Sequence, residues 1–307
     1  MTPEPKNLIV VLGPTASGKT SLAARLAHDF HGEIISADSR QVYRGMDIGT
    51  GKDLEQYHVG GKAVKYHLID IMDPSEEFSV YTFQKLFYAT FDGLRKRHVL
   101  PILVGGTGLY LEAILLGYDM PPIEERNQER ELMEKDTGEL RRILSSFRPK
   151  LHNTTDWMDK KRLIQRILIE QAKANGKSAL EKPKINAAVF GIRWERAELR
   201  KRIVQRLQER LEKGLIREVE ELHRKGIPWE RLDSFGLEYR FVSAYLRKQM
   251  TYEEMVKGLA IAIGQFAKRQ ETWFRRMEKR GISIEWIKGA NYEELKEKVQ
   301  LSLKDEG

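Results

Sequence analysis

Eight residues near the N-terminus have the types and spacing of a phosphate-binding loop. The stretch "GPTASGKT" fits the pattern G-x-x-x-x-G-K-T. In such a loop successive backbone N–H groups point at one anion, and the glycines permit the torsions that this requires. Lys19 would reach the outer phosphate oxygens, and the Thr20 hydroxyl would lie where Mg²⁺ bridges them. The predicted binding residues are Gly13, Pro14, Thr15, Ala16, Ser17, Gly18, Lys19 and Thr20.

A phosphate-binding loop lies between a strand and a helix, and the sequence predicts both. The apolar run Leu8–Leu12 predicts a buried strand, and residues 20–28 carry apolar side chains on one helical face. The N-terminus of that helix would add its partial positive charge to the anion site. A strand before and a helix after argue against a chance match in a glycine-containing turn, so the sequence predicts a phosphate site.

Strands and helices alternate through the first part of the chain. Further strands are predicted over residues 33–37, 66–71 and 100–104, with a helix over 79–97. This order is typical of an α/β fold in which helices cover both faces of a parallel sheet. With the phosphate loop, it predicts a P-loop NTPase-like core.

The alternation stops at "GYDMPPIEERNQ". Pro121 and Pro122 end the preceding segment, and a polar, helical stretch follows. A strand returns at 187–192, and the remainder is mostly helical with one late strand in "GISIEWI". We therefore expect a helical insertion over residues 118–186 between two parts of the core, 1–117 and 187–307.

Chemically useful side chains follow the predicted strands, where ligands of open parallel sheets collect. Asp38 and Ser39 come directly after the strand over 33–37. A carboxylate there could hold Mg²⁺ through water, could act as a general base, or could simply cap a turn. In "YHLIDIMDP", Asp70 is a further candidate for a metal-binding acid.

A third group follows the strand over 100–104. Gly105, Gly106 and Gly108 suggest close backbone approach to a ligand, although a plain turn with Thr107 as the helix N-cap explains them equally well. This strand ends in glycines where a typical nucleotide hydrolase places a metal-binding acid, which weakens an ATPase interpretation.

Composition narrows the function classes. The chain has 307 residues, 41% of them hydrophobic and 32% charged, which is typical of a globular protein. Its formal charge of +8 favours a polyanionic partner. It has no cysteine, which excludes disulfides, thiolate metal sites and a cysteine nucleophile. No apolar run approaches about 20 residues, so we expect a cytoplasmic protein without a membrane span.

Taken together, the motifs resemble those of the tRNA dimethylallyltransferase family, also called tRNA isopentenyltransferases. The resemblance rests on "GPTASGKT", "ADSRQVYRGMDIGT", "DIMDP", "PILVGGTGLYL" and the late "AKRQETW", and it covers nearly the whole chain. Members transfer a dimethylallyl group from dimethylallyl diphosphate to N6 of the adenosine beside the tRNA anticodon, using Mg²⁺. The resemblance thus implies that the loop binds the diphosphate leaving group and needs no nucleoside triphosphate.

The resemblance also implies roles for individual residues. Asp38 would be the general base for the adenine amine, and Lys19, Thr20, the loop amides and Mg²⁺ would stabilise charge on the departing diphosphate. Thr107 matches a position that contacts the substrate nucleotide. Ser39, Arg40 and Gln41 would help to hold the adenosine, which must leave its stack to be alkylated.

Basic residues of the predicted insertion and of the C-terminal half would contact the tRNA anticodon stem-loop. Arg162 and Arg166 are four residues apart and therefore share a helical face, with Lys161 beside them; alone, this would be a solvated face. Arg196, Arg202 and Arg206 are further candidates. We expect a monomer. The tRNA-contacting residues predicted in the insertion are Arg130, Arg162, Leu163, Ile164, Gln165 and Arg166.

The chain departs from the family pattern at three places. Gly264 stands where an Arg usually precedes the Gln, "GLEYR" over residues 236–240 replaces the usual Gly-Tyr pair, and Gln165 stands where Arg is common. All three lie in segments expected to contact tRNA, so they affect which tRNAs we expect the protein to recognise. They leave the predicted diphosphate site intact.

Three alternatives remain open on the sequence. An adenylate isopentenyltransferase would share the loop and the base, but its members generally lack a large basic insertion. A small-molecule kinase would share the P-loop fold. An RNA-binding protein with a degenerate NTPase core would have no need of Lys19, Thr20 and Asp38 together.

Overall fold

The computed structural model describes residues 5–121, 126–147, 159–175 and 180–304, without the side chains of Arg126, Asn127 and Lys161. The chain divides into two compact units. The larger comprises residues 1–116 and 183–307, and the smaller comprises 117–182. The expected insertion, 118–186, covers nearly the same residues as the smaller unit.

The larger unit is built on a six-stranded parallel sheet in the order β5-β2-β6-β1-β7-β8. Its central strands are fully buried, because helices cover both of their faces. This arrangement confirms the α/β prediction. The strands are β1 Leu8–Leu12, β2 Glu33–Ser36, β5 Tyr66–His67, β6 Pro101–Gly105, β7 Ala187–Arg193 and β8 Glu285–Lys288; a separate hairpin pairs β3 His58–Val59 with β4 Lys62–Ala63.

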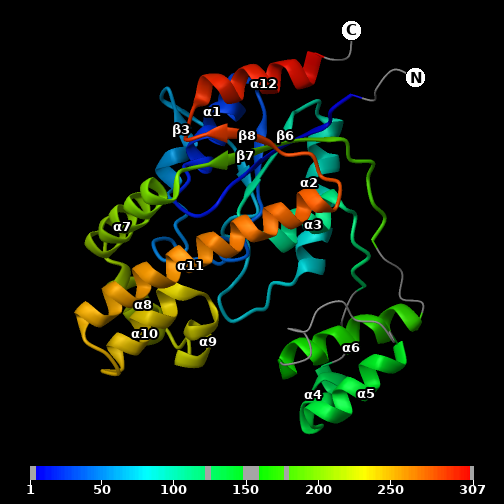
Figure 1. The fold of residues 1–307 in the computed structure, drawn as a ribbon, viewed down its shortest axis with the longest axis vertical. Coiled ribbons are helices and arrows are strands. Elements are labelled where there is room, and N and C mark those ends of the chain that lie inside the picture. The colour runs from blue at the N-terminus through cyan, green and yellow to red at the C-terminus, as the bar shows by residue number, and fades with distance from the viewer. Residues whose placement is uncertain (1–4, 122–125, 148–158, 176–179, 305–307) are drawn as a thin grey trace. The chain divides into compact units, whose positions relative to one another are not determined.

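Helices from both ends of the chain surround this sheet. In Figure 1, α1 and α12 lie on one side of the sheet, and α3 and the long α11 lie on the other. Ile9, Val11, Ile34 and Ile102 pack in one core with the apolar faces of α1 and α12. The helices are α1 Lys19–Asp29, α2 Val80–Lys96, α3 Gly108–Leu115, α7 Arg196–Glu212, α8 Leu215–Arg224, α9 Trp229–Ser234, α10 Leu237–Leu246, α11 Tyr252–Lys279 and α12 Tyr292–Lys304.

Local signals in the sequence explain several helix ends. The side chain of Ser79 accepts a hydrogen bond from the backbone N–H of Thr82 and begins α2. Thr251 and Glu254 form a capping box that begins α11. Among the buried side chains of α11 is one amide, that of Gln270, which lies near the carboxyl ends of β1 and β6.

The smaller unit is helical in its described part. It contains α4 Arg126–Glu134, α5 Thr137–Phe147 and α6 Lys160–Ala174. These helices share a core of their own, formed by Leu132, Leu140, Leu144, Leu163, Ile164, Ile167 and Leu168. The unit therefore buries enough apolar surface to pack as a separate body.

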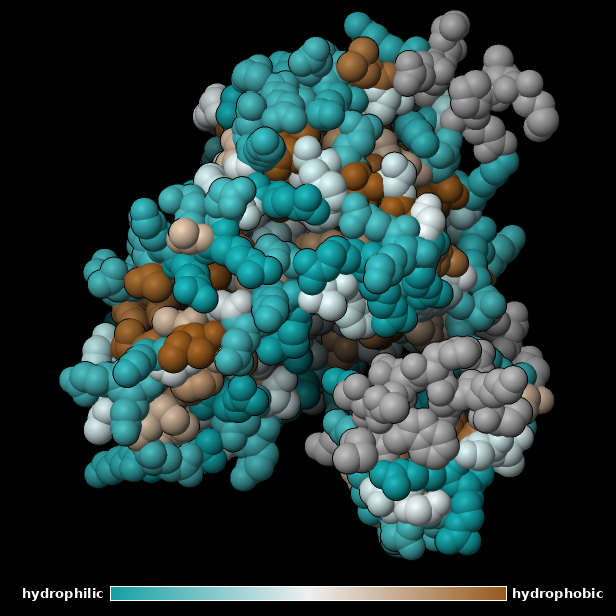
Figure 2. All heavy atoms as spheres, viewed as in Figure 1, coloured by the Kyte–Doolittle hydropathy of each residue, from teal (hydrophilic) through white to brown (hydrophobic). Residues whose placement is uncertain are grey.

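The outer surface is mostly polar. The face in Figure 2 is largely hydrophilic, with hydrophobic residues in small patches. The large exposed apolar side chains include Val204 on α7 and Ile261 and Phe266 on α11. In the described part of the chain, no helix combines the length and apolar character that crossing a membrane requires.

Candidate active site

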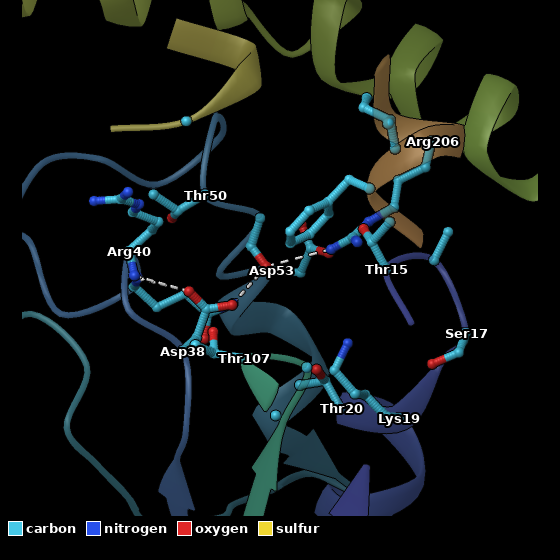
Figure 3. Close-up of a pocket in the computed structure, with 18 of the residues that line it drawn as sticks. Thr15, Ser17, Lys19, Thr20, Asp38, Arg40, Thr50, Asp53, Thr107 and Arg206 are labelled. Carbon is cyan, nitrogen blue, oxygen red and sulfur yellow. Dashed lines mark hydrogen bonds and ion pairs between the residues drawn. The ribbon is translucent and has the colours of Figure 1, made fainter. Parts of the chain in front are cut away.

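A cavity of about 650 Å³ opens in the larger unit beyond the carboxyl ends of β1, β2 and β6. The loops that follow these three strands line it, together with residues 49–51, 53 and 55–57 and side chains of α7 and α11. Figure 3 shows Lys19 and Thr20 in this cavity together with Asp38, Thr107 and Arg206. The structure thus brings the predicted loop, the predicted base and Thr107 to one site.

The phosphate loop has the tight backbone that its motif predicts. A Cβ on Gly13 would lie 2.7 Å from Oγ of Ser17, and Gly18 has a φ of 85°, so both positions favour glycine. The Ser17 hydroxyl is buried and has no hydrogen-bond partner among the described residues. A buried, unpartnered hydroxyl in such a loop is suited to bind an oxyanion.

Side chains from distant parts of the chain hold the back of this loop. Arg202 Nε donates a hydrogen bond to the Ala16 carbonyl at 2.9 Å, and Trp194 Nε1 donates to the Ser17 carbonyl at 2.9 Å. Because these carbonyls are bonded on the outer side, the loop conformation is fixed. Arg202 was among the predicted phosphate contacts, but its Nε binds protein; Trp194 was not predicted.

Gln270 links two of the loops that line the cavity. Its Oε1 accepts from the Thr15 backbone N–H, and its Nε2 donates to the Gly106 carbonyl, each at 2.9 Å. A Cβ on Gly106 would lie 2.4 Å from that Nε2, which explains the glycine. The motif "AKRQETW" contains this glutamine, but the sequence alone gave no role for it.

Cations dominate the part of the cavity around Lys19. Nζ of Lys19 lies 3.3 Å from the Pro14 carbonyl oxygen. The pKa of Lys19 is lowered to about 8, mainly by burial and also by the charge of Arg206, while Asp38 partly offsets these effects. Arg206 forms an ion pair with Asp53 at 2.5 Å. Such a group of cations is suited to bind a multiply charged anion.

Two charged residues near Lys19 were not predicted from the sequence. Asp53 follows "GTGK" and binds Arg206, while Arg210 is buried and pairs with Glu238 at 2.8 Å. The sequence offered Arg206 of α7 only as a candidate for a tRNA phosphate contact. Only the fold shows that Arg206 and Arg210 line the cavity.

Asp38 is held by its own turn. Its Oδ1 accepts from the backbone N–H groups of Arg40, at 2.8 Å, and Gln41, at 3.3 Å. Its Oδ2 accepts no hydrogen bond from the described residues. One oxygen therefore fixes the carboxylate, as the turn-capping alternative predicted, and the other is available on the cavity side for a proton or a metal ion.

Strand register places Thr107 beside this turn. Ser36 of β2 pairs with Val104 of β6, so the residues two and three positions beyond each strand are neighbours at the same edge. Thr107 occupies the N-cap position of α3, but its side chain makes no capping hydrogen bond. Its hydroxyl is therefore available to the cavity that Thr107 lines.

Two predicted residues, Gln41 and Asp70, bind other parts of the protein. Gln41 lines the cavity but is buried; its Oε1 accepts from the Ser36 hydroxyl at 3.1 Å and its Nε2 donates to the Gly51 carbonyl at 3.0 Å, so it also holds protein loops together. Asp70 does not line the cavity and instead forms an ion pair with the buried Lys52. Ser39 and Arg40 line the cavity beside Gln41.

The predicted residues of the smaller unit divide into exposed and buried ones. Arg130, Arg162 and Gln165 are exposed on α4 and α6. Leu163 and Ile164 pack in the core of that unit, so their side chains are not available to an RNA. Arg166 is half-buried, and its Nε lies 3.5 Å from a carboxylate oxygen of Glu170. The Lys161 side chain lies outside the described residues.

The predicted Mg²⁺ site belongs to the same cavity. Across the described residues, no group of three or more His, Asp or Glu side chains could hold a metal ion. Mg²⁺ often keeps several waters and binds through one or two protein oxygens plus substrate phosphates. Thr20 and Asp38 both line the cavity and offer such oxygens, so the residues fit an ion that arrives with a diphosphate.

Comparisons with known proteins agree with this geometry. A model of the family described as IPP transferase matches residues 41–277, and one described as Isopentenyl transferase matches residues 6–64. The chain is 54% identical to tRNA dimethylallyltransferase 1 of Syntrophus aciditrophicus, over 97% of this chain and 99% of the relative. It is 52% identical to tRNA dimethylallyltransferase 2 of Trichlorobacter lovleyi, over 92% of each chain.

A solved structure shares the whole fold. The full-length tRNA isopentenylpyrophosphate transferase of Bacillus halodurans superimposes with a TM-score of 0.71 at 32% identity, covering 99% of this chain and 98% of the other. The sequence matches, the shared fold and the cavity that joins a phosphate loop to Asp38 lead to one conclusion: the chain is a member of the IPP transferase family, to which the tRNA dimethylallyltransferases belong.

Proposed function

We propose that this protein transfers the dimethylallyl group of dimethylallyl diphosphate to N6 of the adenosine beside the anticodon of a tRNA. The observation that carries the proposal is one cavity lined by both the phosphate loop and Asp38. Named relatives that match nearly the whole chain support the same reaction. A tRNA substrate implies that the enzyme works in the cytoplasm, and we propose that it does so as a monomer.

The reaction is a substitution at the allylic carbon. A bond forms between N6 of adenosine and that carbon, while the carbon–oxygen bond to the diphosphate breaks. Oδ2 of Asp38 takes the proton from N6. Lys19, Arg206 and the loop amides stabilise the negative charge that develops on the leaving diphosphate. Thr107 contacts the adenosine, which Ser39 and Arg40 help to hold outside its stack.

Mg²⁺ is proposed as the cofactor. Thr20 would hold it, together with diphosphate oxygens and water, and Asp38 lines the same cavity. When bound, the ion supplies positive charge that neutralises the diphosphate. The buried Ser17 hydroxyl would complete the set of loop donors to the same group.

A transfer assay tests this proposal. The protein is incubated with bulk unmodified tRNA, Mg²⁺ and radiolabelled dimethylallyl diphosphate, and the nucleosides are then analysed. We expect labelled N6-substituted adenosine from tRNA and none from free AMP. Absence of labelled product would contradict the proposal. Label on AMP would favour an adenylate isopentenyltransferase, and stoichiometric ADP formation from ATP would favour a kinase.

Donor affinity should depend on pH through Lys19. With a pKa of about 8, Lys19 is mostly protonated at pH 7 and mostly neutral at pH 9. Because the charged form attracts the diphosphate, affinity for dimethylallyl thiolodiphosphate, an unreactive analogue, should fall as pH rises through 8. Calorimetric titration from pH 7 to 9.5 measures it. Lys19→Arg keeps its charge over this range, so its affinity for the analogue should change less with pH. The same pH dependence in the wild-type protein and in Lys19→Arg would contradict the assignment of Lys19 as the titrating group.

Binding of tRNA should depend on salt through the smaller unit. Arg162 is exposed, and its contact with Asp159 at 3.7 Å is a weak surface pair. If Arg162 binds a phosphate, Arg162→Ala should lower the slope of log K against log salt by about one unit. Filter binding across a salt series measures the slope, with Arg162→Lys as the charge-preserving control. An unchanged slope would mean that Arg162 makes no phosphate contact.

A further inference from the structure

Glu218 of α8 binds a loop that leads into the cavity. Its carboxylate accepts hydrogen bonds from three successive backbone N–H groups, those of Asp47 at 2.8 Å, Ile48 at 2.7 Å and Gly49 at 2.9 Å. The Tyr239 hydroxyl donates to the same carboxylate at 2.8 Å. Three consecutive amides directed at one anion form a strong, oriented contact. Glu218 therefore determines how the backbone turns at residues 47–49.

Residues 46–53, here the 46–53 loop, continue from this contact into the site. Gly49, Thr50, Gly51 and Asp53 all line the cavity. The Asp53 carboxylate pairs with Arg206 at 2.5 Å, and the Gly51 carbonyl oxygen lies 3.3 Å from Nη2 of Arg206. The loop thus supplies both acceptors that orient this guanidinium.

The 46–53 loop packs closely against side chains of α7 and α10. A Cβ on Gly49 would lie 2.5 Å from the Tyr239 ring, and one on Gly51 would overlap the Arg210 guanidinium. Asp53 itself has a φ of 45°, which a non-glycine residue adopts only when its surroundings fix it. A change at Glu218 is therefore transmitted along a short, closely packed segment to Asp53.

We propose that Glu218 is a positioning residue for donor binding, which acts through the 46–53 loop on Arg206. This inference rests on the proposed function, because it assumes that Arg206 binds the donor diphosphate. Glu218 does not line the cavity, so any effect on the donor must pass through other residues.

A double-mutant cycle with dimethylallyl thiolodiphosphate tests this coupling. Glu218→Ala should weaken binding of the analogue by about tenfold, and in an Arg206→Ala background the same change should cost less than about twofold. In transfer assays the donor KM should rise while the tRNA KM stays the same. Glu220 is an exposed carboxylate on the same helix, so Glu220→Ala is the matched control. This variant should bind the analogue with wild-type affinity.

Two outcomes would overturn the inference. One is wild-type analogue affinity in Glu218→Ala; the other is an equal loss in both backgrounds, which a purely structural role would produce. Should Glu218→Ala fail to fold, Glu218→Gln keeps carbonyl acceptor capacity and should show a smaller loss, about threefold, that also disappears in the Arg206→Ala background. If the wild-type protein binds the analogue but transfers no dimethylallyl group to tRNA, the result contradicts the proposed function and not the role of Glu218.

Discussion

Asp38→Asn should slow a single turnover by about 10²- to 10⁴-fold while tRNA affinity barely changes. The amide keeps the shape of the carboxylate, and its oxygen can still accept from the Arg40 and Gln41 backbone N–H groups that now bind Oδ1. What it loses is the proton acceptor at Oδ2. Rapid-quench measurement with saturating donor and tRNA gives the rate of the chemical step.

Other roles of Asp38 predict different results for the same variant. If Asp38 mainly organises Mg²⁺, the substitution should weaken donor binding, and excess Mg²⁺ should restore part of the activity. If it only caps its turn, stability should fall by about 1 kcal/mol while turnover is preserved. A melting curve and a Mg²⁺ series on this one variant distinguish the three roles. A single turnover at the normal rate would remove Asp38 from the mechanism.

Lys19→Ala should abolish most activity at subsaturating donor, with a loss of about 10²- to 10³-fold in kcat/KM. The substitution removes a charge that lies within the phosphate loop and near Arg206, so the diphosphate loses stabilisation both when it binds and when it leaves. Steady-state kinetics with varied donor measure the loss. Affinity for tRNA, measured without donor, serves as the internal control.

A conservative variant separates charge from geometry at this position. Lys19→Arg keeps a cation but replaces a compact ammonium with a larger planar group, so it should recover donor affinity better than it recovers turnover. Wild-type rates in Lys19→Ala at low donor would show that the loop amides and Arg206 suffice without this side chain. ATP should act only as a competitor for the loop.

The sheet and the phosphate loop were predictable because they depend on local signals. Buried strands of a parallel sheet appear as continuous apolar runs, and β1 and β6 lie within one residue of their predicted limits. The strand predicted over 66–71 is shorter, since β5 ends at His67. Leu68 and Asp70 have φ values of 63° and 57°, and Asp70 turns toward Lys52. An apolar run cannot reveal such a local turn.

Contacts between distant segments could not be predicted in the same way. Gln270, Trp194 and Glu218 act on loops far from them in sequence, and each has a side chain common on ordinary helices or loops. The periodicity of the α6 sequence shows which helix face is apolar. It does not show whether a residue on that helix contacts RNA or packs in the protein core. The structure assigns Leu163 and Ile164 to the core.

The bond between Thr15 and Gln270 joins residues 255 positions apart and has a consequence for synthesis. During translation an N-terminal segment can begin to fold before the rest exists. Here the phosphate loop would emerge from the ribosome early, yet it would lack Trp194 and Arg202 until α7 had been made, and Gln270 until α11 had been made. A nascent chain or a fragment that ends before α11 would thus hold a phosphate loop without its bond to Gln270. Full anion affinity should appear only when the chain is nearly complete.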